Sequence, residues 1–196
     1  MRIDLDIVQQ WIRPKSRVLD LGCGSGELLD RLTKEKQVTA YGIEIDPEKI
    51  TRCVEKRVNV IEQNLDEGLK NFDDGSFDTV VMSQTLQAVS YPHLVLDEML
   101  RVGRECIVSF PNFGYWRCRV HLGLHGHMPV SKFLPYTWYD TPNIHFCTID
   151  DFEDFCREKS IRIINRRYVT AGRDDDALSV RWPNMCAEMA IYRLTR

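Results

Sequence analysis

A loop with three alternating glycines constrains this chain more than any other feature. Gly22, Gly24 and Gly26 lie at and just beyond the end of the short apolar run of residues 16–23, and residues 26–35 have helical periodicity. Glycines at a strand-to-helix turn permit positive φ and let backbone N–H groups approach a ligand closely. This arrangement is typical of nucleotide-binding α/β folds, so we expect a strand, a ligand-binding loop and a helix here.

Strands and helices continue to alternate up to about residue 110. A short amphipathic helix over residues 3–12 precedes them and is expected to pack against the sheet edge. Further strands are expected at residues 38–46, 58–64, 79–83 and 105–110, and further helices at 47–57 and 91–102. Because these strands are apolar enough for burial on both faces, they predict a parallel sheet with helices on either side.

The rhythm breaks in residues 111–146, where Pro, Gly and aromatic residues are frequent. We expect this segment to be a cap inserted into a single domain that spans residues 1–196. A helix over residues 148–160, with Thr148 as its N-cap, and two strands at 161–169 and 185–194 follow the cap. The predicted fold class is therefore α/β, with a Rossmann-like, doubly wound, mostly parallel sheet and an antiparallel C-terminal hairpin strand.

Two details of the glycine loop distinguish its candidate ligands. Glu27 stands where a dinucleotide-binding loop has its last glycine, and Asp20 lies at the mouth of the loop. A carboxylate there repels pyrophosphate, whereas S-adenosylmethionine has no phosphate and carries an ammonium group and a sulfonium. We therefore favour S-adenosylmethionine over NAD as the cofactor.

The residues expected to bind the cofactor follow four successive strands. Glu44, about 20 residues beyond the glycines, can accept hydrogen bonds from ribose hydroxyls, and Ile45 can cover one adenine face. Asn64 can meet the adenine edge, although a turn-forming role explains it equally well. The predicted cofactor-binding residues are Asp20, Gly22, Cys23, Gly24, Gly26, Glu44, Ile45, Asn64, Leu65, Met82 and Ser83. The sequence assigns no catalytic residue.

Composition argues against several other classes of protein. The net charge of -3 shows no basic bias, so nucleic acid is not an expected partner. No window approaches the roughly 18 apolar residues of a membrane span, and the amino terminus lacks a signal-peptide core, so we expect a cytoplasmic protein. The seven cysteines include no CxxC pair, and His121, His125 and His127 lack nearby ligands at metal-binding spacing, so we expect no metal site.

The strand-end motifs together resemble those of class I S-adenosylmethionine-dependent methyltransferases. LDLGCGSGELL, GIEIDPEKI, VIEQNLDEGL and DGSFDTVVMSQTLQAV occur in that family's order. A narrower resemblance, nearly from end to end, is to the MetW family of bacterial methionine biosynthesis proteins, through TLQAVSYP, LDEMLRVGRECIVSFPNFGYWRCR, MPVSKFLPYTWYDTPNIHFCTIDDFE and AIYRL. This resemblance implies a site for S-adenosylmethionine or S-adenosylhomocysteine and a homoserine O-acyltransferase, an enzyme of the α/β-hydrolase kind, as an activated partner.

The sequence leaves the chemistry open between three functions. The chain could be a regulatory partner that senses the cofactor, a small-molecule methyltransferase with His145 or Tyr136 as acid-base residues, or a scaffold with an empty loop. The aromatic residues of the cap likewise suit three uses. They could be buried on the sheet, form a docking edge at residues 116–119 and 135–143, or line an acceptor pocket.

Overall fold

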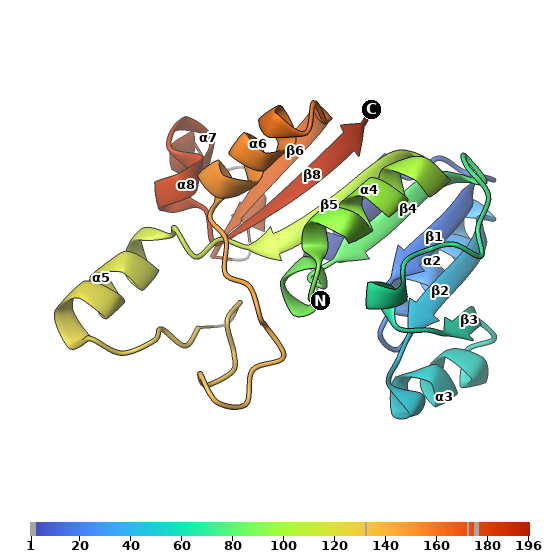
Figure 1. Ribbon diagram of the computed structural model, residues 1–196, viewed down its shortest axis with the longest axis horizontal. Coiled ribbons are helices and arrows are strands. Elements are labelled where there is room, and N and C mark those ends of the chain that lie inside the picture. Colours follow the sequence, from blue (N-terminus) through green and yellow to red (C-terminus); the bar gives the residue numbers. More distant parts are fainter. Residues whose placement is uncertain (1–2, 132, 172, 175–176) are drawn as a thin grey trace.

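The computed structural model describes residues 3–131, 133–171, 173–174 and 177–196, and they form an eight-stranded sheet with the order β3-β2-β1-β4-β5-β8-β6-β7 (Figure 1). The strands are β1 (Arg17–Leu21), β2 (Thr39–Glu44), β3 (Asn59–Glu62), β4 (Phe77–Ser83), β5 (Gly103–Pro111), β6 (Arg162–Thr170), β7 (Arg173–Asp174) and β8 (Met189–Thr195). The first five strands are parallel, and β8 lies antiparallel between β5 and β6. The predicted fold class, including the antiparallel hairpin, is confirmed.

Helices cover both faces of the sheet (Figure 1). The helices are α1 (Ile3–Trp11), α2 (Glu27–Lys36), α3 (Pro47–Glu55), α4 (Pro92–Val102), α5 (Trp116–His125), α6 (Ile149–Glu158), α7 (Ala177–Arg181) and α8 (Pro183–Cys186), with 3₁₀ turns η1 (Leu65–Glu67) and η2 (Leu86–Ala88). Apolar side chains of α4 and α6 belong to one core cluster, and those of α1, α2 and α3 belong to a second. The central strands lie between these clusters, which explains why their sequences are almost uniformly apolar.

Local sequence signals set where the helices begin. The Asp46 side chain accepts a hydrogen bond from the Glu48 N–H, and Pro47 occupies the first turn of α3, where a missing N–H costs little. Thr148 and Asp151 form a reciprocal capping box at the start of α6. The predicted Thr148 cap is therefore confirmed, and such a cap contributes about 1 kcal/mol to stability.

Three expectations about the fold need correction. Helix α1 lies across a face of the sheet, because Leu5, Ile7 and Val8 share a core cluster with residues of β4, β5, β6 and β8. The cap (residues 111–146) contains α5, which the sequence analysis did not predict. The acidic sequence of residues 173–178 predicts a solvated loop, but this stretch contains β7 and the start of α7, while its Asp175 and Asp176 lie outside the described residues.

None of the helices in the described part of the chain has both the length and the apolar character that crossing a membrane requires.

Candidate functional site

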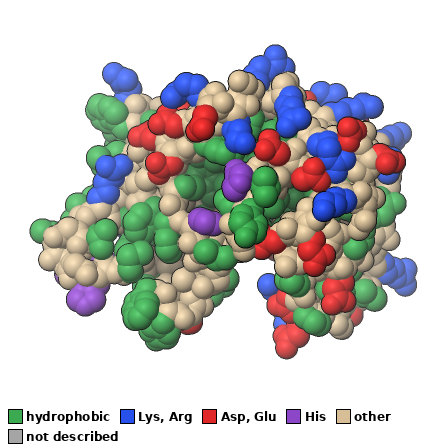
Figure 2. All heavy atoms as spheres, viewed as in Figure 1, with side chains coloured by type: hydrophobic (Ala, Val, Ile, Leu, Met, Phe, Trp, Pro, Cys, Tyr) green, Lys and Arg blue, Asp and Glu red, His purple; other side chains and the backbone are tan. Residues whose placement is uncertain are grey.

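A cleft of about 680 Å³ opens at the carboxyl ends of the parallel strands, within the volume range of small-molecule sites. Figure 2 shows this side of the molecule hollowed between the cap and the region of α3. The cleft is lined by the glycine loop, the residues that follow β2, β3 and β4, and part of the cap. The lining residues are Gly22, Gly24, Ser25, Ile43, Glu44, Ile45, Lys49, Arg52, Gln63, Asn64, Leu65, Asp66, Ser83, Gln84, Thr85, Gln87, Ala88, Val89, Phe133, Pro135, Tyr136, Pro142 and Asn143.

The glycine loop follows the neighbouring strand closely before it turns into α2. The N–H groups of Gly22 and Cys23 donate to the carbonyl oxygen of Ile43 at 2.8 and 3.0 Å. A Cβ at Gly22 would lie 2.6 Å from the Thr85 side chain, so only glycine fits between the loop and the residues after β4. At Gly24, where φ is +58°, a Cβ would meet no described atom within 4 Å. Gly24 therefore presents open backbone to the cleft.

Glu44 ends β2 and is buried, with only 7% of its surface exposed. Its Oε2 accepts from the Gly24 N–H at 2.8 Å, and its Oε1 accepts from the N–H groups of Ile45 at 2.9 Å and Asp46 at 3.1 Å. An ionised carboxylate has about four acceptor positions, so these three bonds leave room for one more donor. Ile45 beside it is exposed at the cleft, as a residue that covers a ligand face should be.

Asn64 and Leu65 form the wall of the cleft after β3. The Asn64 Oδ1 accepts from the Asp66 N–H at 3.0 Å and caps η1, so its turn-forming role is confirmed. Leu65 is buried in the core beneath this turn. Asp66 in turn accepts from the Ser90 N–H at 2.9 Å, which joins the wall to the segment that leads into α4.

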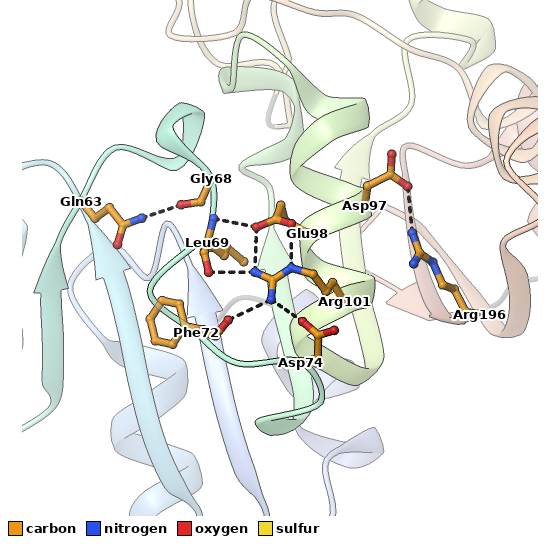
Figure 3. Close-up of polar contacts among 9 residues, drawn as sticks. All are labelled: Gln63, Gly68, Leu69, Phe72, Asp74, Asp97, Glu98, Arg101 and Arg196. Atoms are coloured by element: carbon orange, nitrogen blue, oxygen red, sulfur yellow. Dashed lines mark hydrogen bonds and ion pairs between the residues drawn. The ribbon is translucent and has the colours of Figure 1, made fainter.

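Figure 3 shows how Glu98 and Arg101 of α4 hold the segment that follows this wall, residues 68–74. Arg101 donates to both carboxylate oxygens of Glu98 at 2.8 and 2.9 Å, to the carbonyl oxygens of Leu69 and Phe72, and to Asp74. Glu98 also accepts from the Leu69 N–H at 3.1 Å. The Arg101 hydrogen bond lowers the pKa of Glu98, and the two carboxylates beside Arg101 raise its own pKa. The ion pair therefore persists at neutral pH.

The end of β4 is tied to the amino-terminal helix by a buried carboxylate. Asp4 of α1 is 2% exposed, and its Oδ2 accepts from Ser83 Oγ and Gln84 Nε2, both at 3.0 Å. Ser83 Oγ also lies 3.0 Å from Ser109 Oγ on β5. Gln84, with φ of +56°, then turns the chain into the cleft. Sequence reasoning did not find Asp4, because nothing local connects it to a strand 79 residues away.

Gln87 joins the cleft to the cap. Its carbonyl oxygen accepts from the N–H groups of Ile144 and His145 at 2.7 and 3.0 Å. Its side-chain Nε2 donates to the Gln84 carbonyl oxygen at 2.9 Å, while its Oε1 is buried with no hydrogen-bond partner among the described residues. Sequence reasoning assigned no role to Gln87, Lys49 or Arg52, although Gln87 lies in TLQAVSYP and Lys49 in GIEIDPEKI. Nothing in the residue type or position distinguishes these three from ordinary helix and turn residues.

Four of the predicted cofactor-binding residues do not line the cleft. Asp20, Cys23, Gly26 and Met82 lie behind the lining residues, with Asp20, Cys23 and Met82 buried. The Cys23 Sγ lies 4.0 Å from the Sγ of Cys53, and burial raises the pKa of both thiols. These thiols therefore stay protonated and pack under the loop, instead of acting as nucleophiles.

The cap is fastened at its base and exposed beyond it. Buried Asn112 donates to the carbonyl oxygens of Asn184 and Ala187 at 3.0 and 2.8 Å, and its Oδ1 accepts from the Gly114 N–H at 2.9 Å. The interpretation of the cap aromatics as core is wrong for Trp138, which is 75% exposed. The same holds for Tyr139.

Two histidines of the cap, His121 and His125, stack with ring centroids 4.8 Å apart on α5. Within the described residues, no group of three or more His, Cys, Asp or Glu side chains is placed to hold a metal ion.

Comparison with known proteins gives one family over nearly the whole chain. The family model for methionine biosynthesis protein MetW matches residues 2–194. The "bifunctional methionine biosynthesis protein MetXA/MetW" of Rhodopirellula baltica is 32% identical over 205 residues, which cover 100% of this chain and 33% of that protein. The ribosomal protein L11 methyltransferase of Paraburkholderia phytofirmans is 36% identical over 112 residues, covering 55% of this chain and 36% of that protein. The chain thus spans about a third of the length of the curated relatives it matches.

Solved structures with the same fold include S-adenosylmethionine-dependent methyltransferases. A methyltransferase of this kind from Archaeoglobus fulgidus superposes with a TM-score of 0.72 at 16% identity, covering 100% of this chain and 92% of that one. A putative methyltransferase in complex with the Haloferax volcanii methyltransferase activator Trm112 superposes with a TM-score of 0.69 at 14% identity, covering 99% of this chain and 89% of that one. The class I methyltransferase fold expected from the sequence is therefore confirmed.

Proposed function

The chain belongs to the family of methionine biosynthesis protein MetW, and from this membership we propose that it binds S-adenosylmethionine or S-adenosylhomocysteine and activates or regulates a homoserine O-acyltransferase. We place this activity in the cytoplasm. The observation that carries the cofactor proposal is the strand-end cleft, in which the glycine loop and Glu44 form one hydrogen-bonded unit.

The chemistry of the cleft suits a nucleoside that carries hydrogen-bond donors. Glu44 retains an acceptor position for a ribose hydroxyl, and exposed Ile45 offers an apolar surface to an adenine ring. The buried Gln87 Oε1 gains most from a ligand that brings an N–H or O–H group, because an unsatisfied buried acceptor is costly. Adenine, ribose and an ammonium group supply such donors.

We assign the predicted cofactor residues to two roles. Those that line the cleft are proposed to contact the cofactor: Gly22, Gly24, Glu44, Ile45, Asn64, Leu65 and Ser83. Asp20, Cys23, Gly26 and Met82 are proposed to support the loop and strand ends from behind. No residue is assigned to methyl transfer in this proposal, since a regulatory protein needs only to bind.

The partner proposal is supported by the relative from Rhodopirellula baltica, whose name assigns MetXA and MetW to one bifunctional protein. Fusion keeps two proteins at a high effective concentration, which is useful when they act on one another. A cofactor that bound the free and complexed forms with different affinity would then transmit methionine supply to the acyltransferase.

A second candidate function, methyl transfer to a small molecule, is favoured by Tyr136, whose side chain belongs to the cleft wall and could act as an acid-base group. His145, the other acid-base candidate, instead lies 3.3 Å from the Ser90 carbonyl oxygen in a neighbouring pocket with Phe152 and Phe155. Turnover of a methyl acceptor would separate this function from the first.

The deciding experiment combines purification and activity. The protein is co-purified with the homoserine O-acyltransferase of the same organism, and homoserine acylation is measured with and without the protein and with added S-adenosylmethionine or S-adenosylhomocysteine. We expect a stable complex with higher acylation, and a change on adding cofactor. Absence of a complex together with unchanged acylation would contradict the proposal and direct attention to methyl acceptors.

A further inference from the structure

The cap carries an exposed apolar surface that the cofactor site does not use. Met128, Tyr136, Trp138 and Phe146 surround a shallow depression, and the Tyr139 ring contacts Trp138 edge-on at 5.7 Å. We call these five residues the cap face. They are between 37% and 75% exposed, although Trp and Tyr are side chains that folded proteins usually cover. In Figure 1 the cap projects away from the sheet.

The size of the cap face matches the anchor of a protein interface. Aromatic side chains bury about 150–250 Å² each when fully covered, and Trp138 and Tyr139 are 75% and 73% exposed. Covering these two side chains would therefore supply roughly a third of the ~800 Å² that each partner contributes to a standard interface. Trp and Tyr are also the residues that most often dominate binding energy. The largest apolar patch on a protein surface is often an interaction site.

The cap face is continuous with the cofactor cleft. Tyr136 and Asn143 line both the depression on the cap face and the cleft. The next residue, Ile144, is held by the carbonyl oxygen of cleft-lining Gln87 at 2.7 Å. A ligand that contacts Tyr136 from the cleft side therefore changes a wall that a partner contacts from the other side.

Charge distinguishes a different protein from a second copy as the occupant. Within the described residues the cap carries Arg117 and Arg119 against the single carboxylate Asp140, whereas the chain as a whole has a net charge of -3. Two caps packed face to face would bring like charges together. The cap is therefore complementary to an apolar surface on another protein that is bordered by carboxylates, because the carboxylates would face the arginines of the cap.

We propose that the cap face docks the acyltransferase subunit, and that cofactor in the cleft alters this docking through Tyr136 and Asn143. This inference rests on the proposed function for the identity of the partner. By linkage, the acyltransferase must then change cofactor affinity by the same factor as the cofactor changes acyltransferase affinity. Such couplings are commonly between about 5-fold and 150-fold.

The first test compares two surface substitutions with a matched control. Trp138→Ser combined with Tyr139→Ser removes the centre of the cap face, and Trp182→Ser removes an exposed tryptophan before α8. Titration calorimetry measures the affinity of each full-length variant for the acyltransferase and for S-adenosylhomocysteine. We expect the double variant to bind the acyltransferase at least tenfold more weakly with cofactor affinity within about twofold of wild type, and the control to match wild type.

Three results would overturn the inference. If wild type and double variant bind the acyltransferase equally, docking lies elsewhere while the proposed function stands. If wild type does not bind the acyltransferase at all, the proposed function fails and the inference fails with it. If sedimentation shows a wild-type dimer that the double variant loses, the cap face belongs to a second copy of this chain.

The coupling is tested separately with Tyr136→Ala. The ratio of S-adenosylhomocysteine affinities with and without saturating acyltransferase is compared between this variant and wild type. We expect a ratio of at least about fivefold in wild type that falls to within about twofold in the variant. An unchanged ratio in the variant would show that Tyr136 does not carry the coupling.

Discussion

The backbone N–H of Gly24 donates a 2.8 Å hydrogen bond to the Oε2 of Glu44, which joins the middle of the glycine loop to the end of the neighbouring strand. The two residues belong to separate motifs, 20 positions apart. Because Glu44 also receives the N–H groups of Ile45 and Asp46, one buried carboxylate organises both the loop and the turn into α3. The glycine loop and the end of β2 therefore form one structural unit.

Glu44→Gln should weaken both the fold and the cofactor site. A glutamine amide keeps one oxygen, which can accept two N–H groups, and it places an NH₂ group against the third. We expect the free energy of unfolding to fall by about 1–3 kcal/mol and S-adenosylhomocysteine affinity to fall at least tenfold. Denaturant unfolding and titration calorimetry measure the two effects. Glu62→Gln, at an exposed strand end paired with Glu44 in register, is the matched control and should change neither.

Gly24→Arg should abolish cofactor binding and leave the fold intact. A Cβ at Gly24 meets open space, so the arginine side chain enters the cleft, and the left-handed backbone costs about 1–2 kcal/mol. Gly75→Arg is a close control, because Gly75 also has positive φ and would place its Cβ in open space, in a turn outside the cleft. Both variants should lose similar stability, but only Gly24→Arg should fail to bind S-adenosylhomocysteine. Normal binding by Gly24→Arg would mean that the cofactor occupies another site.

The sequence predicted the parallel half of the fold well because each element carries its own periodic signal. The strand that precedes Gly22 and the strand that ends at Glu44 are both confirmed by their pairing in the sheet. Helix α5 was missed because its residues, which include Gly123 and His121, form no apolar stripe and because Tyr115 at its N-cap provides no side-chain cap. The position of α1 was predicted wrongly because periodicity identifies an apolar face but not the surface that it covers.

The sequence predicted the cleft residues that lie at strand ends. It did not predict the residues that reach the cleft through contacts between segments distant in sequence. Glu44 ends one strand and Asn64 lies just beyond the next. In an α/β fold such positions lie at the carboxyl edge of the sheet, where ligands bind. Asp4 and Gln87 reach the site through contacts with residues distant in sequence, and a single sequence carries no record of such contacts. Cys23 lies within the loop motif, yet its side chain is buried under the loop because of the turn that its glycine neighbours make.

Asp4→Ala should loosen the turn after β4. The substitution removes the buried acceptor of two partly buried donors, Ser83 Oγ and Gln84 Nε2, so the free energy of unfolding should fall by about 2 kcal/mol. Cofactor affinity should also fall, since Ser83 and Gln84 both line the cleft. Asp6→Ala is the control on the same helix, because Asp6 pairs with Arg31 in a partly exposed position and should cost less than about 1 kcal/mol. Equal losses in the two variants would contradict a special role for Asp4.

The Glu98–Arg101 pair should make stability depend on pH in the acid range. Hydrogen bonding to Arg101 lowers the pKa of Glu98 in the folded protein, so the folded state binds this proton less readily than the unfolded chain. The resulting stabilisation is complete above the unfolded pKa of about 4.3 and is lost as pH falls through the folded pKa.

Arg101→Met should therefore reduce the slope of unfolding free energy against pH between about pH 5 and 3, and it should lower stability at pH 7 by about 2–3 kcal/mol. Stability falls at pH 7 because Glu98 and the carbonyl oxygens of Leu69 and Phe72 all lose the donor that Arg101 provides. Arg104→Met removes an exposed arginine that lies 3.4 Å from Asp78, so stability should change by no more than about 0.5 kcal/mol. Denaturant titrations at several pH values measure both quantities. A slope in Arg101→Met as steep as in wild type would show that Arg101 does not lower the pKa of Glu98, and that the wall beside Asn64 owes its stability to other contacts.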